Sequence, residues 1–490
     1  MRKQPKPCFI VQFPLKAVNA CTAEKAQKRF RIGAHIHNVM VSHAIHCLNG
    51  LARDAEYQTL LKQYKKNKKF SPSEKKEMLE VLHKHGLSVS QFDAYVIKQK
   101  KLFEPEIHVH LAENISRDVW HGVEKILYST GKNLHYKKMN DFQSFSAKTD
   151  TGIRYRSGYI LWGSGKNELR FSVRIRNNDP YSPAVLGQPK YCMIVRRWHN
   201  NRRRYYVQVV YEGYPPERTV LANGGKVGID IGPSTIAAVS RNNIVFAELG
   251  NGIDKAEREI ARLNRKRDRQ RRANNPQNFN ENGTVKSGSR RWTVSHSEFK
   301  TKQKIRGLYQ KRKNLLDYQH HCLVKRLLEM GDGFYAESMN WQALARKAKK
   351  TEVSEKTGRC KKKKRFGKSV ANHAPYKLLS ILAYKLKQAG CELHKVDTFS
   401  TKASQYNHIT GEFKPAELNE RWKYLDEDNL VQRDLYSAFL LQHVSHDSAI
   451  YDFASINNDY PDFKVMHDSV IAELKSEKAN GMRFPPCMGI

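Results

Sequence analysis

Three acidic residues that lie far apart in the sequence are candidates for one catalytic site. Asp230 lies inside the apolar run KVGIDIG, Glu337 ends the run FYAE, and Asp434 stands near the start of an expected helix. Carboxylates gathered without cations raise one another's pKa values, so such a cluster costs stability unless a cation neutralises it. Two Mg²⁺ ions about 4 Å apart can activate water on one side of a phosphodiester and stabilise the departing oxygen on the other. We therefore predict that these three acids are catalytic ligands of two Mg²⁺ ions, for which Mn²⁺ can substitute.

The elements around the three acids are expected in the order strand, strand, strand, helix, strand, helix, strand, helix. Residues 226–250 read as three strands, with Asn242 and Asn243 in a hairpin turn. A basic helical insertion, residues 253–329, precedes the strand that ends at Glu337. Its second helix is expected to bury one side, formed by Ile305, Leu308, Leu315, Leu323 and Leu327. This is the order of the ribonuclease H fold, an α/β sheet whose first three strands form an antiparallel meander. The first and fourth strands of that fold are central neighbours and its last helix packs over their ends, so the acids can converge.

The glycines around Asp230 admit a second interpretation. The pattern Gly-x-Asp-x-Gly also opens the phosphate-binding strand of the actin, hexokinase and heat-shock ATPases. Those proteins need a second Asp-Gly phosphate loop and a glycine-rich adenosine pocket, and the sequence after Gly232 offers neither. Gly228 and Gly232 are expected instead to leave room for phosphate and metal beside the backbone. Taken singly, an acid such as Asp434 could also be paired with a neighbouring cation such as Arg433.

The pattern along the chain predicts several domains. Strand patterns in residues 1–23 and 141–224 indicate one β-rich domain, interrupted by amphipathic helices in residues 24–140. Capping boxes at Ser71 and Ser88 open two of these helices. The α/β domain follows in residues 225–445. Residues 446–490 are less basic and are expected to form an appended C-terminal extension.

The composition indicates a polyanionic partner. Lys plus Arg number 87 against 48 Asp plus Glu, a formal net charge of +39. Lys and Arg gain affinity for nucleic acid by displacing counterions from phosphates, which makes DNA or RNA the expected partner and an anionic membrane the weaker rival. The apolar runs are too short for a membrane span or an export signal, so we expect an intracellular protein. The eight cysteines show no C-x-x-C spacing, which argues against a disulfide framework.

Basic and aromatic residues recur where strands or helices could present them to phosphates and bases. The candidate nucleic-acid contacts are Arg174, Arg176, Arg196, Arg197, Trp198, Arg203, Arg258, Arg262, Arg265, Arg269, Lys361, Lys362, Lys363, Lys364, Arg365 and Lys368. An ordinary solvated surface or loop is the alternative for each group. A histidine cluster near Cys47 (His35, His37, His43 and His46) could bind a metal, but packing within the protein or contact with RNA is the favoured interpretation.

Together these features resemble a known family. GIDIG, an Arg-rich helical insertion, a strand ending in Glu, a basic loop and RDLYSAFLL occur in the order of the RuvC-like nuclease of the TnpB (OrfB) transposon-associated proteins and the type V CRISPR effectors. The resemblance covers residues 8–445, with Asp230, Glu337 and Asp434 at the positions of the family's catalytic acids. It implies an RNA-guided DNA endonuclease that recognises a short flanking DNA motif, with a β-rich wedge domain gripping guide RNA and a helical recognition lobe holding the guide–target duplex. Double-stranded and single-stranded DNA would be its targets, and a monomer and a dimer are both compatible with the sequence.

The sequence departs from the family between the last strand and the last helix. The family usually carries a four-cysteine zinc ribbon there, whereas residues 397–429 contain no cysteine, so zinc is not expected. A metal-free lid is expected instead, packed through Phe399, Tyr406, Phe413, Leu418, Trp422 and Tyr424. Two other functions stay open: a guide-RNA-dependent DNA-binding repressor without cleavage, and a transposase that joins DNA strands. The compact size favours a transposon-type or an early CRISPR-type member.

Overall fold

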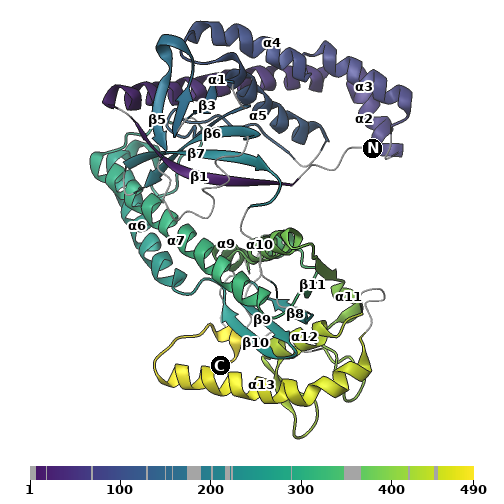
Figure 1. Ribbon diagram of the computed structural model, residues 1–490. Helices are drawn as coiled ribbons and strands as arrows, with labels where there is room; N and C mark the ends of the chain where they lie inside the picture. Colours follow the sequence, from purple (N-terminus) through teal and green to yellow (C-terminus); the bar gives the residue numbers. More distant parts are fainter. Residues whose placement is uncertain are drawn as a thin grey trace. The chain divides into compact units, whose positions relative to one another are not determined.

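The chain forms two compact units, Met1–Glu217 and Arg218–Ile490 (Figure 1). The computed structural model describes residues 7–17, 19–67, 70–128, 131–148, 151–156, 158–173, 189–199, 202–215, 221, 224–288, 290–346, 366–415, 417, 420–445 and 451–490. Among these residues, no helix combines the length and the apolar character that crossing a bilayer requires.

The first unit is built on an antiparallel sheet of seven strands in the order β2-β6-β7-β1-β5-β4-β3. The strands are β1 (Cys8–Ala17), β2 (Ser144–Lys148), β3 (Ile153–Arg156), β4 (Tyr159–Trp162), β5 (Leu169–Val173), β6 (Tyr191–His199) and β7 (Arg202–Glu212). Alternate residues of β1, from Phe9 to Leu15, are buried, as the period of a strand with one covered face requires. The N-terminal strand thus shares one sheet with strands far along the chain, as the sequence predicts.

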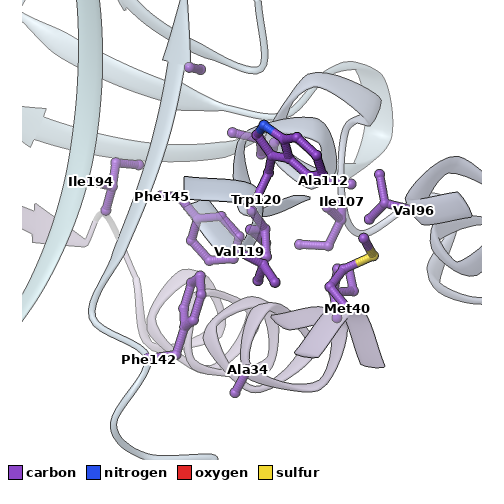
Figure 2. Packing of buried hydrophobic residues seen from close by; sticks show 14 of the residues in the cluster. Ala34, Met40, Val96, Ile107, Ala112, Val119, Trp120, Phe142, Phe145 and Ile194 are labelled. Atoms are coloured by element: carbon purple, nitrogen blue, oxygen red, sulfur yellow. The ribbon is translucent and has the colours of Figure 1, made fainter. Parts of the chain in front are cut away.

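Five helices lie between β1 and β2 in the chain. They are α1 (Ala20–Arg53), α2 (Ala55–Asn67), α3 (Pro72–Lys84), α4 (Val89–Lys100) and α5 (Val109–Tyr128). A short 3-10 turn, Lys101–Phe103, follows α4, and another, Gly165–Asn167, lies between β4 and β5. Both expected capping interactions form: the Ser71 and Ser88 hydroxyls accept the backbone N–H groups of Glu74 and Gln91. Figure 2 shows aromatic and aliphatic side chains of α1, α4, α5 and the sheet, Trp120 and Phe145 among them, packed into one core.

The second unit contains a mixed sheet of five strands in the order β10-β9-β8-β11-β12. The strands are β8 (Lys226–Ile231), β9 (Thr235–Ser240), β10 (Asn243–Glu248), β11 (Gly333–Glu337) and β12 (Leu393–Val396). β8, β9 and β10 form an antiparallel meander, and β8, β11 and β12 run parallel to one another. The first and fourth strands are therefore central neighbours, as expected. Asp332 ties the starts of these two strands together, because its carboxylate accepts the N–H groups of Gly224 and Gly225.

Helices cover both faces of this sheet. They are α6 (Ile253–Asn274), α7 (His296–Leu328), α8 (Trp341–Ala345), α9 (Gly367–His373), α10 (Pro375–Gln388), α11 (Thr398–Thr401), α12 (Arg433–Gln442) and α13 (Phe453–Ala479), with a two-stranded ribbon of β13 (Trp422–Tyr424) and β14 (Leu430–Gln432) and 3-10 turns at Pro276–Asn278 and Pro486–Met488. The basic insertion is the antiparallel pair α6 and α7, which lie side by side in Figure 1. Its buried stripe differs from the expected one, because Leu316 is buried and Leu315 is exposed.

The C-terminal segment is not an appendage, contrary to the expectation for residues 446–490. Ile456, Phe463 and Ile471 of α13 are buried in the same core as α12. The backbone oxygens of Met488 and Gly489 accept hydrogen bonds from the side chains of Gln432 and Trp422. The segment therefore belongs to the α/β unit that holds the acids.

The predicted lid packs through only part of its aromatic set. Tyr406 is buried, stacks on Tyr451 and contacts the tilted ring of Phe413, with ring centroids 5.0 Å apart in both pairs. Trp422 packs against the core. Phe399 is 86% exposed and Tyr424 is 69% exposed, so the expectation that they pack inside the lid is wrong. Leu418 lies outside the described residues.

Candidate active site

Strand alternation places Asp230 and Glu337 on one face of the sheet. Val227, Ile229 and Ile231 point into the core on the opposite face, so Asp230 points towards the face that α12 covers. Ala336 pairs with Ile229 in the parallel register of β8 and β11, which puts Glu337 beside Asp230 on that same face. Two acids thus meet at the carboxyl ends of the two central strands.

Asp434 reaches these strand ends from the first turn of α12. Gln432 caps the helix, and its side-chain oxygen accepts the Leu435 N–H at 2.8 Å. The Arg433 Nη2 lies 3.5 Å from an Asp434 oxygen, and its Nη1 donates to the Glu417 carbonyl oxygen at 3.1 Å. Arg433 is thus a partial counter-charge at the edge of the acidic group.

Gly228 lets α12 rest directly on β8. A Cβ built on Gly228 would lie 1.9 Å from the Ala438 carbonyl oxygen and 2.4 Å from the Gln442 nitrogen, both backbone atoms of α12. The expectation that Gly228 leaves room for phosphate and metal is therefore wrong, because the helix occupies that space. A Cβ on Gly232 would lie 3.2 Å from the Thr235 hydroxyl, a contact that a side chain can relieve.

The acids influence one another electrostatically. Burial, then the Asp434 carboxylate, then the Glu337 carboxylate raise the pKa of Asp230 well above its usual value, while Arg433 and a hydrogen bond from Ser437 oppose the rise. Burial raises the pKa of Glu337 to about 7. The three predicted acids are thus brought together, and the charge of the group is only partly compensated by the protein.

The donor set suits a hard cation but is not a closed site. All three side chains offer carboxylate oxygens, the ligands that Mg²⁺ prefers, and the raised pKa values of Asp230 and Glu337 indicate charge that a cation would relieve. Within the described ranges, however, no three His, Cys, Asp or Glu side chains already have the arrangement that holds a metal ion. Mg²⁺ commonly takes only one or two carboxylates, with water and substrate phosphate supplying the rest. The residues present therefore fit Mg²⁺ bound together with substrate.

Two residues near the acids were not predicted from the sequence. Ser437 lies on α12 three residues after Asp434, a spacing that places both on one helix face and could have revealed it. The Tyr451 hydroxyl donates to the Thr401 carbonyl oxygen at 2.8 Å, and burial and then Glu337 raise its pKa. No local pattern marks Tyr451, because it follows the last predicted element.

Among the predicted nucleic-acid contacts, Arg196 has a structural role. Its guanidinium is buried, with 4% of the residue exposed, donates to the backbone oxygens of Phe142 and Asn140, and lies 4.5 Å from the centre of the Phe30 ring. This prediction is therefore wrong for direct contact, since the β6 side chain is covered by the segment before β2. Arg203 is more accessible and donates to the Asn140 side chain.

The other basic candidates of the first unit are only partly placed. Arg197 is exposed and lies over the Tyr206 ring at 5.9 Å, and Trp198 pairs with Arg203 across β6 and β7. The candidates outside the described residues are Arg174, Arg176, Lys361, Lys362, Lys363, Lys364 and Arg365. Lys368 is described and lies 3.4 Å from a carboxylate oxygen of Glu257 on α6.

The arginines of α6 form an exposed stripe. Ile260 and Leu263 are buried, and the opposite side carries four exposed arginines, Arg258, Arg262, Arg265 and Arg269. The Arg262 guanidinium is held by Glu259, at 2.8 and 2.6 Å. The stripe therefore faces solvent as predicted, with one of its members already paired.

The N-terminal histidines are engaged in packing. The His43 ring stacks on Tyr95 with centroids 3.8 Å apart and lies 3.7 Å from the Cys47 sulfur, and His35 meets the Phe103 ring edge-on. As far as the structure describes the chain, these residues form no metal-binding group. Packing is thus the interpretation that the contacts support.

Comparison with known proteins gives remote similarities only. No family model and no curated protein matches the chain. Among solved structures, a cryo-EM structure of a Cas12f1–sgRNA–target DNA complex aligns at 11% identity and a TM-score of 0.44, covering 88% of this chain and 98% of that one. A CRISPR-Cas12f ternary complex aligns at 13% and 0.26, covering 87% and 82%, and a Cas12i1 R-loop complex before target DNA cleavage aligns at 9% and 0.26, covering 90% and 61%. With TM-scores this low, the function has to be inferred from this chain's own residues.

Proposed function

We propose that this chain is an RNA-guided DNA endonuclease whose second unit carries a RuvC-like nuclease site of the ribonuclease H type. The observation that carries the proposal is the meeting of Asp230, Glu337 and Asp434 at the carboxyl ends of the central strands of a sheet whose strand order is 3-2-1-4-5 in the order of the chain. A pair of Mg²⁺ ions held there would activate water and stabilise the departing oxygen of a phosphodiester.

The protein's own residues would position those ligands. Asp230 and Glu337 hold fixed places on adjacent strands, and Gly228 allows α12 to bring Asp434 to them. Ser437 and Arg433 both oppose the rise in the pKa of Asp230, and the charge of Arg433 limits the repulsion among the carboxylates. The raised pKa of Asp230 means that cation binding must also displace protons at low pH, so activity is expected to rise with pH until the group is fully ionised.

The proposed partners follow from the charge and from the family resemblance. A net charge of +39 favours nucleic acid. We assign the seven-stranded sheet to a wedge domain that binds guide RNA, and helices α1 to α5 to a lobe that holds the guide–target duplex. Both double-stranded and single-stranded DNA would then serve as target, in the cytoplasm of a prokaryotic cell.

The decisive experiment begins with the RNA. The full chain is purified from cells, the nucleic acid that comes with it is sequenced, and target DNA matching the variable end of that RNA is offered with Mg²⁺. Asp230→Ala should lower cleavage by at least about 10²-fold, several kcal/mol of transition-state stabilisation, without weakening DNA binding. Glu427→Ala, which removes an exposed acid of the same unit, is the matched control and should cut normally. Equal cutting by the Asp230 variant and the control would refute the site.

A repressor that binds without cleavage is the second candidate. The observation in its favour is that the described residues contain no preassembled group of metal ligands. The repressor would bind the same RNA and DNA but leave the DNA intact in Mg²⁺ and in Mn²⁺. A strand-joining transposase would yield joined rather than cut products and would need no RNA.

A further inference from the structure

Buried side-chain amides hold the described part of the connection between α6 and α7, residues 275–288 and 290–295. Its sequence, NNPQNFNENGTVKSGS, has low complexity. Asn275 is nevertheless fully buried: its amide donates to the Thr293 carbonyl oxygen at 2.9 Å and its oxygen accepts the Thr293 N–H at 2.7 Å. Asn278 donates to the Arg291 carbonyl oxygen, and Phe279 forms a β-bridge with Val285. These buried amide contacts fix the tip of the helical hairpin.

The fixed tip supports two arginines on two aromatic rings. The Arg271 guanidinium lies 3.5 Å from the centre of the Trp292 ring, and the Arg272 guanidinium lies 5.4 Å from the centre of the Phe279 ring. The two rings meet edge to face with centroids 5.7 Å apart. We call these four residues the Arg-aromatic cluster. Cation–π contact holds each guanidinium in place and leaves its N–H groups available to another acceptor.

The acceptor is not supplied by the described part of this chain. Neither Arg271 nor Arg272 has an ion pair or a side-chain hydrogen bond with another described residue, whereas Arg267 on the same helix pairs with Asp268 at 3.0 Å. Glu281 is the single acid between residues 275 and 295. The surrounding cations are Lys286, Arg290 and Arg291. A guanidinium fork fixed in this way matches the two oxygens of a phosphate.

We propose that the Arg-aromatic cluster is a binding site for the phosphodiester backbone of a nucleic acid. Because Arg271 covers a face of Trp292, the ring supports the arginine rather than stacking on a base. The site therefore grips phosphates without reading sequence. The proposal rests on the nucleic-acid partner of the proposed function, but not on cleavage.

The test measures the salt dependence of binding. The full chain with its co-purified RNA carries Asp230→Ala, so that DNA is not cut, and its affinity for target DNA is measured from low to moderate salt. A second arm measures the affinity of RNA-free protein for the same RNA. Arg271→Ala with Arg272→Ala should lower the slope of log K against log salt by about 1.8 for duplex DNA or about 1.4 for single-stranded RNA, in the arm that contains the true ligand.

Matched variants separate contact from folding. Arg267→Ala removes a paired arginine from the same helix and should leave both slopes unchanged. Arg271→Lys with Arg272→Lys should keep most of the slope but bind more weakly, because lysine cannot form the planar fork. A change in the DNA arm alone or in the RNA arm alone names the source of the phosphates. Unchanged slopes in both arms, with the alanine variant melting as the parent does, would overturn the proposal. The proposed cleavage function would still stand, because cleavage is measured separately, on protein that keeps Asp230.

Discussion

Gly228→Ala tests how α12 brings Asp434 to the strands. The added Cβ would lie 1.9 Å from the Ala438 carbonyl oxygen and 2.9 Å from the Leu441 carbonyl carbon. Carbon and oxygen atoms need more than about 3 Å, so α12 must move away from β8 by about 1 Å. The obstructing atoms are backbone atoms of a helix buried along most of its length, and no side-chain rotation relieves the contact.

The expected result has two parts. Overpacking of a core typically costs about 1–3 kcal/mol, which should appear as a lower midpoint in denaturant unfolding. A displacement of about 1 Å at a catalytic group can cost about 10²-fold in rate, which should appear in Mg²⁺-dependent cleavage at saturating DNA. DNA binding should change little, because β8 lies beneath the helix.

Gly232→Ala is the matched control for this substitution. Its Cβ meets the Thr235 hydroxyl at 3.2 Å, and rotation of the threonine can relieve that contact, so the unfolding midpoint should stay near that of the parent. Gly228→Ala protein that unfolds at the parental midpoint and cuts at the parental rate would refute the role assigned to Gly228. Lost cleavage with unchanged stability would show instead that the glycine serves the substrate, as the sequence alone suggested.

Two further substitutions test other parts of the second unit. Burial and then Asp254 raise the pKa of Glu248 from 4.5 to about 7, so its contribution favours folding below pH 4.5 and is lost as the pH rises through 7. Glu248→Gln should therefore match the stability of the parent near pH 5. At pH 8 the variant should be more stable by about 1–2 kcal/mol, after allowance for the partial exposure of the side chain. Urea unfolding at both pH values measures this difference, and equal stability at pH 8 would contradict the prediction. Phe399 lies on the short helix α11 and is 86% exposed. On the same helix, the Thr398 hydroxyl donates to the carbonyl oxygen of Ser338, the residue after Glu337. Phe399→Ala should therefore weaken single-stranded DNA binding by about 10-fold without changing the melting temperature. Phe399→Trp should bind single-stranded DNA as the parent does. Tyr376→Ala removes an exposed aromatic side chain of α10 and should leave the affinity unchanged. Equal losses of affinity in the two alanine variants would refute a specific contact at Phe399.

Local patterns were sufficient to predict the elements that carry the acids. The β8–β10 meander follows from three apolar runs with a turn signal at Asn242 and Asn243, and an acid inside such a run is conspicuous. Strand order then placed β11 beside β8. The capping boxes were equally legible, since a serine and a residue three positions later define them.

Features that depend on contacts between distant segments were not predictable in this way. Arg196 has the same parity in β6 as the buried Cys192 and Ile194, but its charge predicted exposure, and only the segment before β2 shows how the guanidinium is covered. In α7, 33 residues long, the predicted stripe passed through Leu315 although the buried residue is Leu316, because a small error of period accumulates over many turns. Phe399 lies on a helix of four residues, which is too short to have a periodicity.

The position of Asp434 depends on residues far beyond it in the sequence. The backbone N–H of Gln432, the residue that caps α12, donates to the His467 Nε2 at 2.9 Å, which leaves the His467 Nδ1 to donate to Asp468 at 2.8 Å. The Gln432 amide donates to the Met488 carbonyl oxygen while its oxygen holds the Leu435 N–H. The cap is therefore fixed from both sides by the C-terminal segment. Since the first turn of α12 carries the acid, the geometry of the proposed metal site is set by four parts of the chain: two strands, the helix, and the segment that fixes the start of that helix.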